Sequence, residues 1–242
     1  MVTSKKKYVK IQKCIRKQEE QKLTKVKFVS ITFVLLFVGF SISNLSMAET
    51  NLLKPPVIGE DGLYQQEWFH ESFLDLEEDL AEAKGANKRF VVFWEQKGCP
   101  YCKRTHEVNL RIPRIVKYIS DNFIVVHLNI WGDKEVTDFD GEVTTEKKLA
   151  EKWAVRFTPT IQFFPENPLD INKQNGRDAE VMRIPGYFKP FHFYFLFKYV
   201  KAKGYKIEPN FQRWLSSEGD KLAEKGLDVQ KQLWSDTLLF QE

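Results

Sequence analysis

The chain has 242 residues, with 37 Lys and Arg against 33 Asp and Glu and a formal net charge of +4. Ten of the Lys and Arg lie in residues 1–27, whereas the 194 residues from Glu49 onward carry 27 basic and 31 acidic side chains. This slightly acidic part excludes a nucleic-acid-binding protein that depends on a basic face, and its length predicts one domain with insertions.

The basic residues 1–27 are followed by an apolar run over 28–42. A helix of 15 residues spans about 22 Å, less than a bilayer core of about 30 Å, so the run is typical of a secretory signal peptide. Small residues at Ser46 and Ala48 predict cleavage of residues 1–48. The alternative is an N-terminal anchor to the inner membrane formed by residues 28–48. Either way we expect the rest of the chain to be exported to the periplasm.

The next residues, 49–66, are rich in Pro and Gly and predict an extended lead-in. Apolar residues then recur every three or four positions from Phe69 through Phe73 to Ala83, which predicts a helix that Gly85 ends. The continuously apolar residues 89–94 predict a strand covered on both faces.

A second helix is predicted from residue 103 to 109, and Pro113 either kinks it or begins another segment that runs to residue 122. Residues 123–130 form the next apolar strand. The order helix, strand, helix, strand predicts an α/β fold with a parallel strand pair.

Polar residues dominate 131–145 and predict an inserted surface loop of the kind that carries partner recognition, before a short helix over 146–153. Asp138, Asp140 and Gly141 resemble part of a calcium loop, but the remaining ligand positions of an EF-hand are not filled. We therefore interpret them as an acidic turn.

A strand is predicted over 155–164, interrupted by Pro159, which removes a backbone donor. Another strand is predicted over 180–184, and a helix over 189–203 carries aromatic side chains that we assign to the core. From Asn210 the pattern predicts a helix that docks on the domain, then a helical tail to Glu242.

The sequence Cys99-Pro100-Tyr101-Cys102 lies between the predicted strand 89–94 and a predicted helix. A cysteine in the first helical turn faces unpaired backbone N–H groups and the positive end of the helix dipole, which lowers the pKa of its thiol. We therefore assign Cys99 as the attacking thiolate and Cys102 as the resolving thiol that closes an intramolecular disulfide.

Cysteine usage supports a redox role. The third cysteine, Cys14, lies in the basic leader, so the exported part keeps only Cys99 and Cys102 and has no structural disulfide to form. A tetrahedral zinc site needs four ligands, which are not grouped in this sequence. We expect neither a metal nor another cofactor.

Three motifs carry a family resemblance: Phe93-Trp94, Gly98 to Lys103 around the cysteines, and Phe157-Thr158-Pro159-Thr160. The chain resembles the thioredoxin superfamily and, within it, the exported SoxW-type thioredoxins. The resemblance implies a mixed central sheet flanked by helices, with an insert before the proline strand. The segments expected on this basis are a lead-in over 49–66, a thioredoxin-like domain over 67–203 and a helical C-terminal extension over 204–242.

The same resemblance implies a cis peptide bond at Pro159, opposite the cysteines, with the backbone of Thr158 pairing with an extended substrate. The alternative is a trans proline in an edge strand. The other expected substrate-binding residues are Pro100, Tyr101 and Gly186.

The chain departs from ordinary thioredoxins, which place an acid two residues before the strand's tryptophan, where this chain has Val92. The buried proton acceptor is therefore absent from that position. Glu95 is the candidate replacement as a proton relay, and its alternative is a solvated loop carboxylate. His106, four residues after Cys102, is interpreted as a surface or packed histidine rather than a catalytic base.

The sequence thus predicts a periplasmic enzyme that reduces disulfides of client proteins and is recharged by a membrane dithiol donor, acting as a monomer. A disulfide isomerase or oxidase would use the same residues. A non-catalytic module that binds client proteins is the alternative from another class.

Overall fold

The computed structural model describes residues 52–238 and residue 240, so the predicted signal peptide or anchor lies outside the described residues. Within the described residues, no helix is long and apolar enough to cross a membrane. The central sheet has four strands in the order β4-β3-β7-β8. These strands are β3 Arg89–Glu95, β4 Phe123–Asn129, β7 Thr160–Phe163 and β8 Met182–Pro185.

The sheet is mixed, as predicted. Strand β3 pairs in parallel with β4, from Arg89 opposite Phe123 to Glu95 opposite Asn129, and antiparallel with β7, which pairs antiparallel with β8. Every residue of β3 is buried, because β3 is central in the sheet and covered on both faces.

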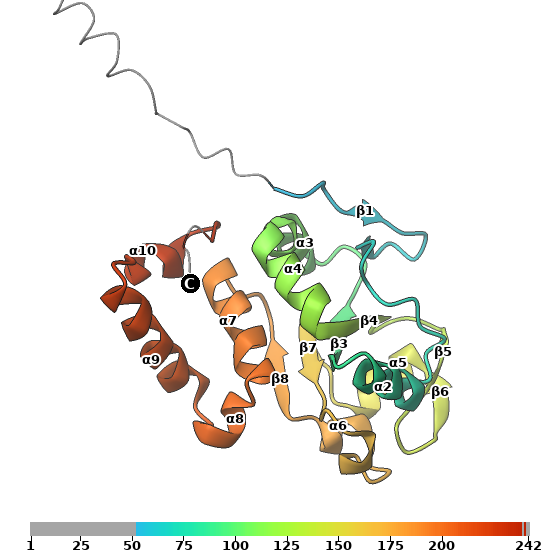
Figure 1. Ribbon diagram of the computed structural model, residues 1–242. Coiled ribbons are helices and arrows are strands. Elements are labelled where there is room, and N and C mark those ends of the chain that lie inside the picture. Colours follow the sequence, from blue (N-terminus) through green and yellow to red (C-terminus); the bar gives the residue numbers. More distant parts are fainter. Residues whose placement is uncertain (1–51, 239, 241–242) are drawn as a thin grey trace, which may run out of the picture. The chain divides into compact units, whose positions relative to one another are not determined.

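Helices cover both faces of this sheet (Figure 1). On one face, α4 (Pro113–Asn122) and α7 (Pro190–Lys201) pack with the side chains of Val91 and Phe93. On the other face, α2 (Leu76–Gly85) and α5 (Glu146–Lys152) pack with those of Val92 and Trp94. Alternate residues of β3 therefore supply two separate cores.

Helix α2 begins later than its apolar spacing predicts. Phe73 is fully exposed rather than part of the helix, and Leu74 adopts a positive φ of 64°. The Asp75 side chain then caps the helix by accepting hydrogen bonds from the backbone N–H groups of Glu77 and Glu78, each at 3.1 Å. The predicted start at Phe69 was wrong because a capping residue overrides apolar periodicity.

Replacing Asp75 with alanine is expected to lower the free energy of unfolding by about 1 kcal/mol, because two backbone donors lose their acceptor. Chemical denaturation measures the change. The matched control is Asp75→Asn, which keeps a side-chain oxygen and is expected to retain most of the stability. An equal loss in both variants would contradict the capping argument.

Pro113 begins a new helix rather than kinking the first one. The cysteine helix α3 spans Pro100–Glu107, a 3-10 turn follows at Asn109–Arg111, and α4 then starts at Pro113. Proline suits this position because the first N–H of a helix has no intrahelical partner.

The predicted surface loop 131–145 is a hairpin in which Asp138 and Phe139 are buried, whereas residues 140–142 at its tip are exposed. Strands β5 (Glu135–Thr137) and β6 (Val143–Thr145) pair antiparallel, and Phe139 stacks on Trp153 with ring centroids 5.9 Å apart. The carboxylate of Asp138 is buried, where it accepts a hydrogen bond from Trp153 Nε1 at 3.0 Å and lies 2.7 Å from Lys152 Nζ. One carboxylate of the acidic turn, that of Asp138, is thus part of the core and pairs with a lysine, while Asp140 and Gly141 lie at the surface.

The proline strand is shorter than predicted. Strand β7 begins only at Thr160, and residues 155–157 are not in a strand. The residues between β7 and α7 include a 3-10 turn (Pro168–Asp170), helix α6 (Gly176–Ala179) and β8.

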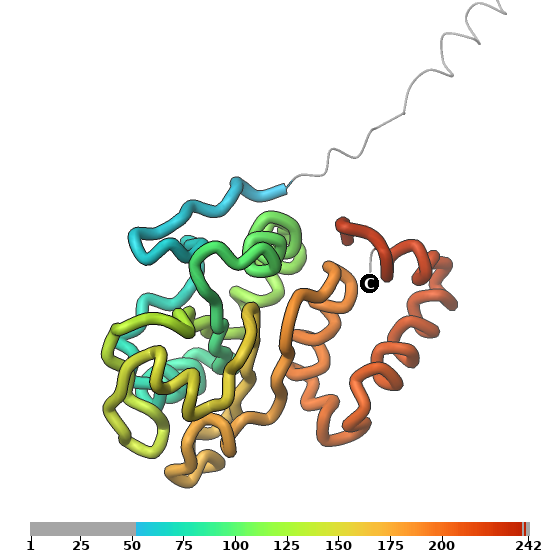
Figure 2. The backbone as a smooth tube through the Cα atoms, turned by 180° about the vertical axis from the view of Figure 1, so that it is seen from behind, coloured from blue at the N-terminus to red at the C-terminus, as the bar shows by residue number. Residues whose placement is uncertain are grey.

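The helical C-terminal extension lies outside α7, as both backbone views show (Figures 1 and 2). It consists of α8 (Gly204–Ile207), α9 (Phe211–Glu224) and α10 (Val229–Trp234). Leu215 and Leu222 of α9 join the core on the α7 side of the sheet. Helix α7 is therefore covered by the sheet on one side and by helices on the other, which explains its many buried aromatic residues.

Candidate active site

The two cysteines form a disulfide at the start of α3. Cys99 is the N-cap residue, and its Sγ accepts a hydrogen bond from the backbone N–H of Cys102 at 3.0 Å. The next residue, Pro100, occupies the first helical position. In the reduced protein, the same N–H group and the helix dipole would stabilise a thiolate on Cys99.

The peptide bond between Thr158 and Pro159 is cis, as the resemblance implied. It places the carbonyl oxygen of Thr158 3.5 Å from Cys99 Sγ. The side-chain hydroxyl of Thr158 is buried without a hydrogen-bond partner among the described residues. The proline turn therefore faces the first cysteine directly.

Two glycines shape the backbone around the disulfide. Gly98, directly before Cys99, has φ +75°, and Gly186 has φ +85°. The N–H of Gly186 donates a hydrogen bond to the carbonyl oxygen of Pro159 at 2.7 Å, which joins β8 to the proline turn. A residue with a Cβ is strained at such φ values.

Solvent reaches the disulfide only at its edge. The exposed fraction is 4% for Cys99 and 1% for Cys102, whereas Tyr101 and Phe157, which neighbour the cysteines and the proline turn in sequence, are 59% and 61% exposed. Both cysteines are therefore buried, Cys99 slightly less than Cys102, whereas the attacking role predicted for Cys99 requires a sulfur that a client can reach.

The family described as thioredoxin-like domain matches residues 76–201, which include both cysteines and Pro159. The chain belongs to the thioredoxin-like family. No curated protein matches the sequence significantly.

Solved structures with a thioredoxin fold are similar to this thioredoxin-like protein. A thioredoxin-fold protein from Helicobacter pylori is 19% identical, with a TM-score of 0.41, over 61% of this chain and 94% of its own. A thioredoxin from Thermus thermophilus is 22% identical, with a TM-score of 0.41, over 54% of this chain and 86% of its own.

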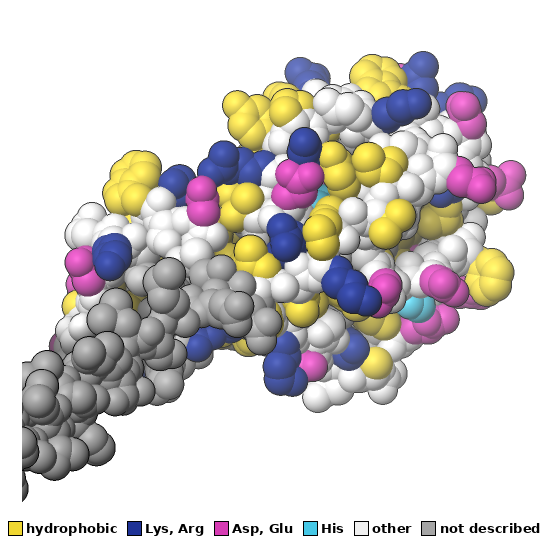
Figure 3. All heavy atoms as spheres, turned by 90° about the horizontal axis from the view of Figure 1, so that it is seen from above, with side chains coloured by type: hydrophobic (Ala, Val, Ile, Leu, Met, Phe, Trp, Pro, Cys, Tyr) yellow, Lys and Arg dark blue, Asp and Glu magenta, His cyan; other side chains and the backbone are white. Residues whose placement is uncertain are grey.

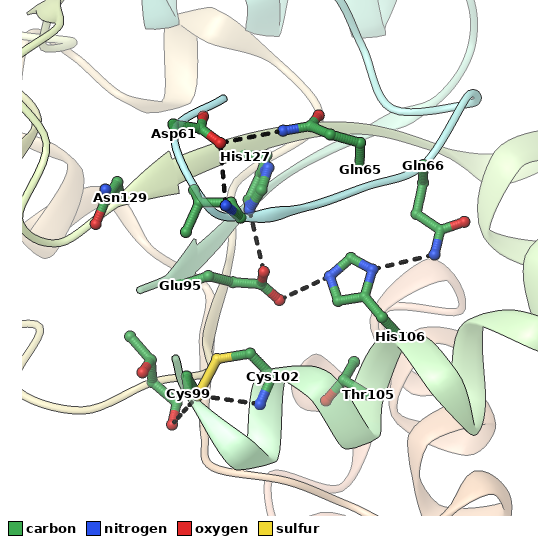
Figure 4. A network of polar contacts seen from close by, with 12 residues as sticks. Asp61, Gln65, Gln66, Glu95, Cys99, Cys102, Thr105, His106, His127 and Asn129 are labelled. Atoms are coloured by element: carbon green, nitrogen blue, oxygen red, sulfur yellow. Dashed lines mark hydrogen bonds and ion pairs between the residues drawn. A yellow bond between two sulfur atoms is a disulfide. The ribbon is translucent and has the colours of Figure 1, made fainter. Parts of the chain in front are cut away.

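Glu95 in this thioredoxin-like protein is not a solvated loop carboxylate. It is the last residue of β3, its exposed fraction is 1%, and two histidines hydrogen-bond to it (Figure 4). His106 Nε2 lies 2.9 Å from Glu95 Oε1, and His127 Nε2 lies 3.1 Å from Glu95 Oε2. His106 is packed, as predicted, with an exposed fraction of 0%.

Burial by itself raises the pKa of Glu95. The hydrogen bonds from His106 and His127, together with the charges of these two residues, outweigh burial and lower the pKa to about 2. Glu95 is thus an anion at neutral pH. Such a carboxylate is a weak acceptor for a thiol proton, which argues against the relay role expected from the sequence.

His127 and Gln66 also belong to the site, although neither was predicted. His127 interrupts the apolar strand β4, and the Nε2 atom of Gln66 lies 3.0 Å from His106 Nδ1. A polar residue in an otherwise apolar strand was the available signal for His127. Nothing in the sequence pattern links Gln66 of the lead-in to α3.

The C-terminal extension reaches the cysteine helix. Arg104 of α3 forms a bidentate ion pair with Asp236, with distances of 2.9 and 3.0 Å, and its guanidinium lies 5.2 Å from the ring centroid of Tyr187. Burial raises the pKa of Tyr187. These contacts place residues after α10 beside the helix that carries the disulfide.

Among the described residues, no group of three or more His, Cys, Asp or Glu side chains is arranged to hold a metal ion. The imidazole nitrogen atoms of His106 and His127 that face the Glu95 carboxylate donate hydrogen bonds to it, so they do not act as metal ligands.

Proposed function

We propose that this protein is an exported thiol-disulfide oxidoreductase that reduces disulfides in client proteins. The observation that carries this proposal is the position of Cys99, which caps α3 and faces the cis bond of Pro159. A cysteine pair at a helix start has the low thiol pKa that disulfide exchange requires, and a neighbouring backbone turn can hold an extended substrate.

The reaction proceeds through two exchange steps. The Cys99 thiolate attacks one sulfur of a client disulfide, forms a mixed disulfide and releases the other client sulfur as a thiolate, which then takes a proton from water. The thiol of Cys102 next loses its proton to water and attacks Cys99 Sγ, so the second client sulfur leaves as a thiolate. The client gains two electrons, and the protein ends as the Cys99–Cys102 disulfide.

Exposed aromatic residues support an unfolded or extended client. Tyr101, Trp131 and Phe157 are 59%, 61% and 61% exposed. They belong to the cysteine helix, the loop after β4 and the segment before the cis bond. Trp131 Nε1 donates a hydrogen bond to Gln96 Oε1 at 2.6 Å, which connects its loop to the one before the cysteines.

Hydrophobic side chains lie among Lys and Arg on the face seen from above (Figure 3). Such a mixture suits protein clients of varied sequence, because apolar contacts need no specific partner.

The proposed location is the periplasm. It is supported by the basic segment 1–27, the apolar run 28–42 and the small residues before Glu49. A membrane dithiol protein is the proposed donor that returns the disulfide to two thiols. The motifs around the cysteines and the Gly132-Asp133 to Asp140-Gly141 insert support a relationship to the SoxW-type thioredoxins.

The second candidate is a disulfide isomerase or oxidase. It uses the same residues, because the chemistry of exchange is common to all three activities. The buried position of Cys99 favours neither direction. The reduction potential of the pair decides between them.

The test is insulin reduction by the full-length protein, followed by equilibration of the Cys99–Cys102 pair with glutathione. We expect insulin reduction well above the rate with dithiothreitol alone and a potential near that of thioredoxin, about −270 mV. A potential near −120 mV would instead indicate that the protein oxidises client thiols. If the protein binds clients but does not accelerate insulin reduction, the result would support the non-catalytic module.

A further inference from the structure

Glu95, His106 and His127 form a buried cluster of ionisable side chains, which we name the Glu95 cluster. Its members come from three elements, β3, α3 and β4, and each carboxylate oxygen accepts one hydrogen bond from an imidazole. The side-chain exposed fractions are 1% for Glu95, 0% for His106 and 9% for His127. Figure 4 shows the carboxylate between the two rings, on the side of the disulfide.

The cluster reaches the cysteine pair through α3. His106 follows Cys102 by four residues, so the two side chains lie on the same face of the helix, about 6 Å apart at their Cβ atoms. Both side chains are buried. A charge at this separation acts strongly on a thiol because little water lies between them.

The charge of the cluster depends on its histidines. Glu95, whose pKa the two histidines lower to about 2, is ionised at neutral pH and contributes a negative charge. Imidazoles are the side chains that ordinarily gain a proton between about pH 8 and pH 5. The net charge of the cluster therefore changes from −1 with two neutral rings to +1 with two protonated rings.

Gln66 accommodates either state of His106. Its amide nitrogen donates to His106 Nδ1 at 3.0 Å, which suits the neutral ring with its proton on Nε2. Rotation of the amide by 180° would present the oxygen to a protonated Nδ1 instead. Gln66 is half-buried in the lead-in, between His106 and solvent.

Other charged and titratable groups surround the cluster. Asp61 pairs with Lys134 at 3.3 Å. Burial raises the pKa of Asp61, but the Leu63 N–H, Lys134 and, least of all, His127 together lower it, whereas burial raises the pKa of Glu146. Tyr64, in the short strand β2 (Tyr64–Gln65) of the lead-in, stacks on His106 with ring centroids 5.3 Å apart. The remaining groups on the neighbouring segments are Lys97 in the loop before Cys99, and Lys103 paired with Glu107 on α3.

We propose that the Glu95 cluster sets how readily the cysteine pair ionises, with protonated histidines favouring the thiolate and the Glu95 carboxylate opposing it. Glu95 and His106 act on the two thiols only through their charges and do not touch the client. They are therefore positioning residues rather than catalytic ones. The inference rests on the proposed function only for its consequence, which is that the reducing power of the pair varies with pH.

The test compares Glu95→Gln with His106→Gln in the full-length reduced protein, using the pH dependence of alkylation of Cys99 by iodoacetamide. Glu95→Gln is expected to speed alkylation about tenfold at pH 5.5, because the opposing charge is lost. His106→Gln is expected to slow it by a similar factor at pH 5.5, because a ring that can carry a positive charge beside the pair is lost. In equilibrium with glutathione, the two variants should shift in opposite directions, Glu95→Gln towards the reduced protein.

The matched control is Asp138→Asn, which neutralises a buried carboxylate that pairs with Lys152 on the β5–β6 hairpin rather than with the cluster. It is expected to leave the alkylation profile unchanged. If Glu95→Gln does not fold, His127→Gln replaces it in the comparison and is expected to slow alkylation at pH 5.5, as His106→Gln does.

Shifts of the same sign in Glu95→Gln and His106→Gln, or no shift in either, would leave the cluster with a structural role only and overturn the proposal. The alkylation profile needs no client and no turnover. A protein that fails to reduce insulin but shows the opposite shifts would therefore overturn the proposed function and retain the cluster.

Discussion

Replacing Cys99 with alanine is expected to abolish insulin reduction, with a loss of more than about a hundredfold, whereas Cys102→Ala is expected to trap a client on Cys99. The difference follows from the positions of the two sulfurs. Cys99 caps α3 and faces the Thr158 carbonyl at 3.5 Å, while Cys102 lies inside the helix with an exposed fraction of 1%. We therefore expect Cys99 to begin the exchange and Cys102 to end it.

The measurement is insulin turnover, together with non-reducing electrophoresis of each variant mixed with a disulfide-containing protein. Cys14→Ala is the matched control, because it removes the third cysteine and is expected to leave turnover unchanged. A mixed disulfide that forms in Cys99→Ala and not in Cys102→Ala would reverse the two assigned roles. Full turnover in Cys99→Ala would remove the catalytic assignment.

The second large effect is expected at Phe197 of α7, whose replacement by alanine should lower the free energy of unfolding by about 3–5 kcal/mol. Phe197 is fully buried between α7 and the sheet. Its ring centroid lies 5.0 Å from that of Phe123, 5.1 Å from Phe163 and 5.1 Å from Phe193. Removing the ring leaves a cavity that joins two strands and a helix, and these neighbours cannot all move to fill it.

Chemical denaturation measures this loss, and Phe73→Ala is the matched control. Phe73 has the same side chain but is fully exposed before α2, so its removal is expected to change stability by less than about 0.5 kcal/mol. Equal losses at the two positions would contradict the packing described for α7.

Much of the domain could be predicted from local patterns. The continuously apolar run predicted β3 because a strand covered on both faces needs apolar residues at every position. The cysteine pair at a helix start required only the order strand, cysteines, helix, and the structure places Cys99 at the cap of α3.

Patterns failed where one residue or one distant contact decided the structure. The cap at Asp75 moved the start of α2 past Phe73, although the spacing of apolar residues continued through it. The polar segment 131–145 did not show that Phe139 would pack on Trp153, because its apolar residues are too few to form a pattern.

The environment of Glu95 shows the same limit at the candidate site. Its position beside the cysteines identified it as a residue of interest, but its solvation depends on His106 and His127, which lie 11 and 32 residues further along the chain. The two histidines also argue against the proton-relay role expected for Glu95, because they hold its pKa far below the range of a proton acceptor for a thiol.

The sequence by itself determined the cysteine pair at a helix start, the parallel strands β3 and β4 with the helices between them, and the apolar residues of these elements, because these depend on spacing along the chain. Only the tertiary structure decided the charge around the pair. Ionisation depends on the distance and burial of groups from β3, α3, β4 and the lead-in, and these groups become neighbours only when the sheet and its helices have formed.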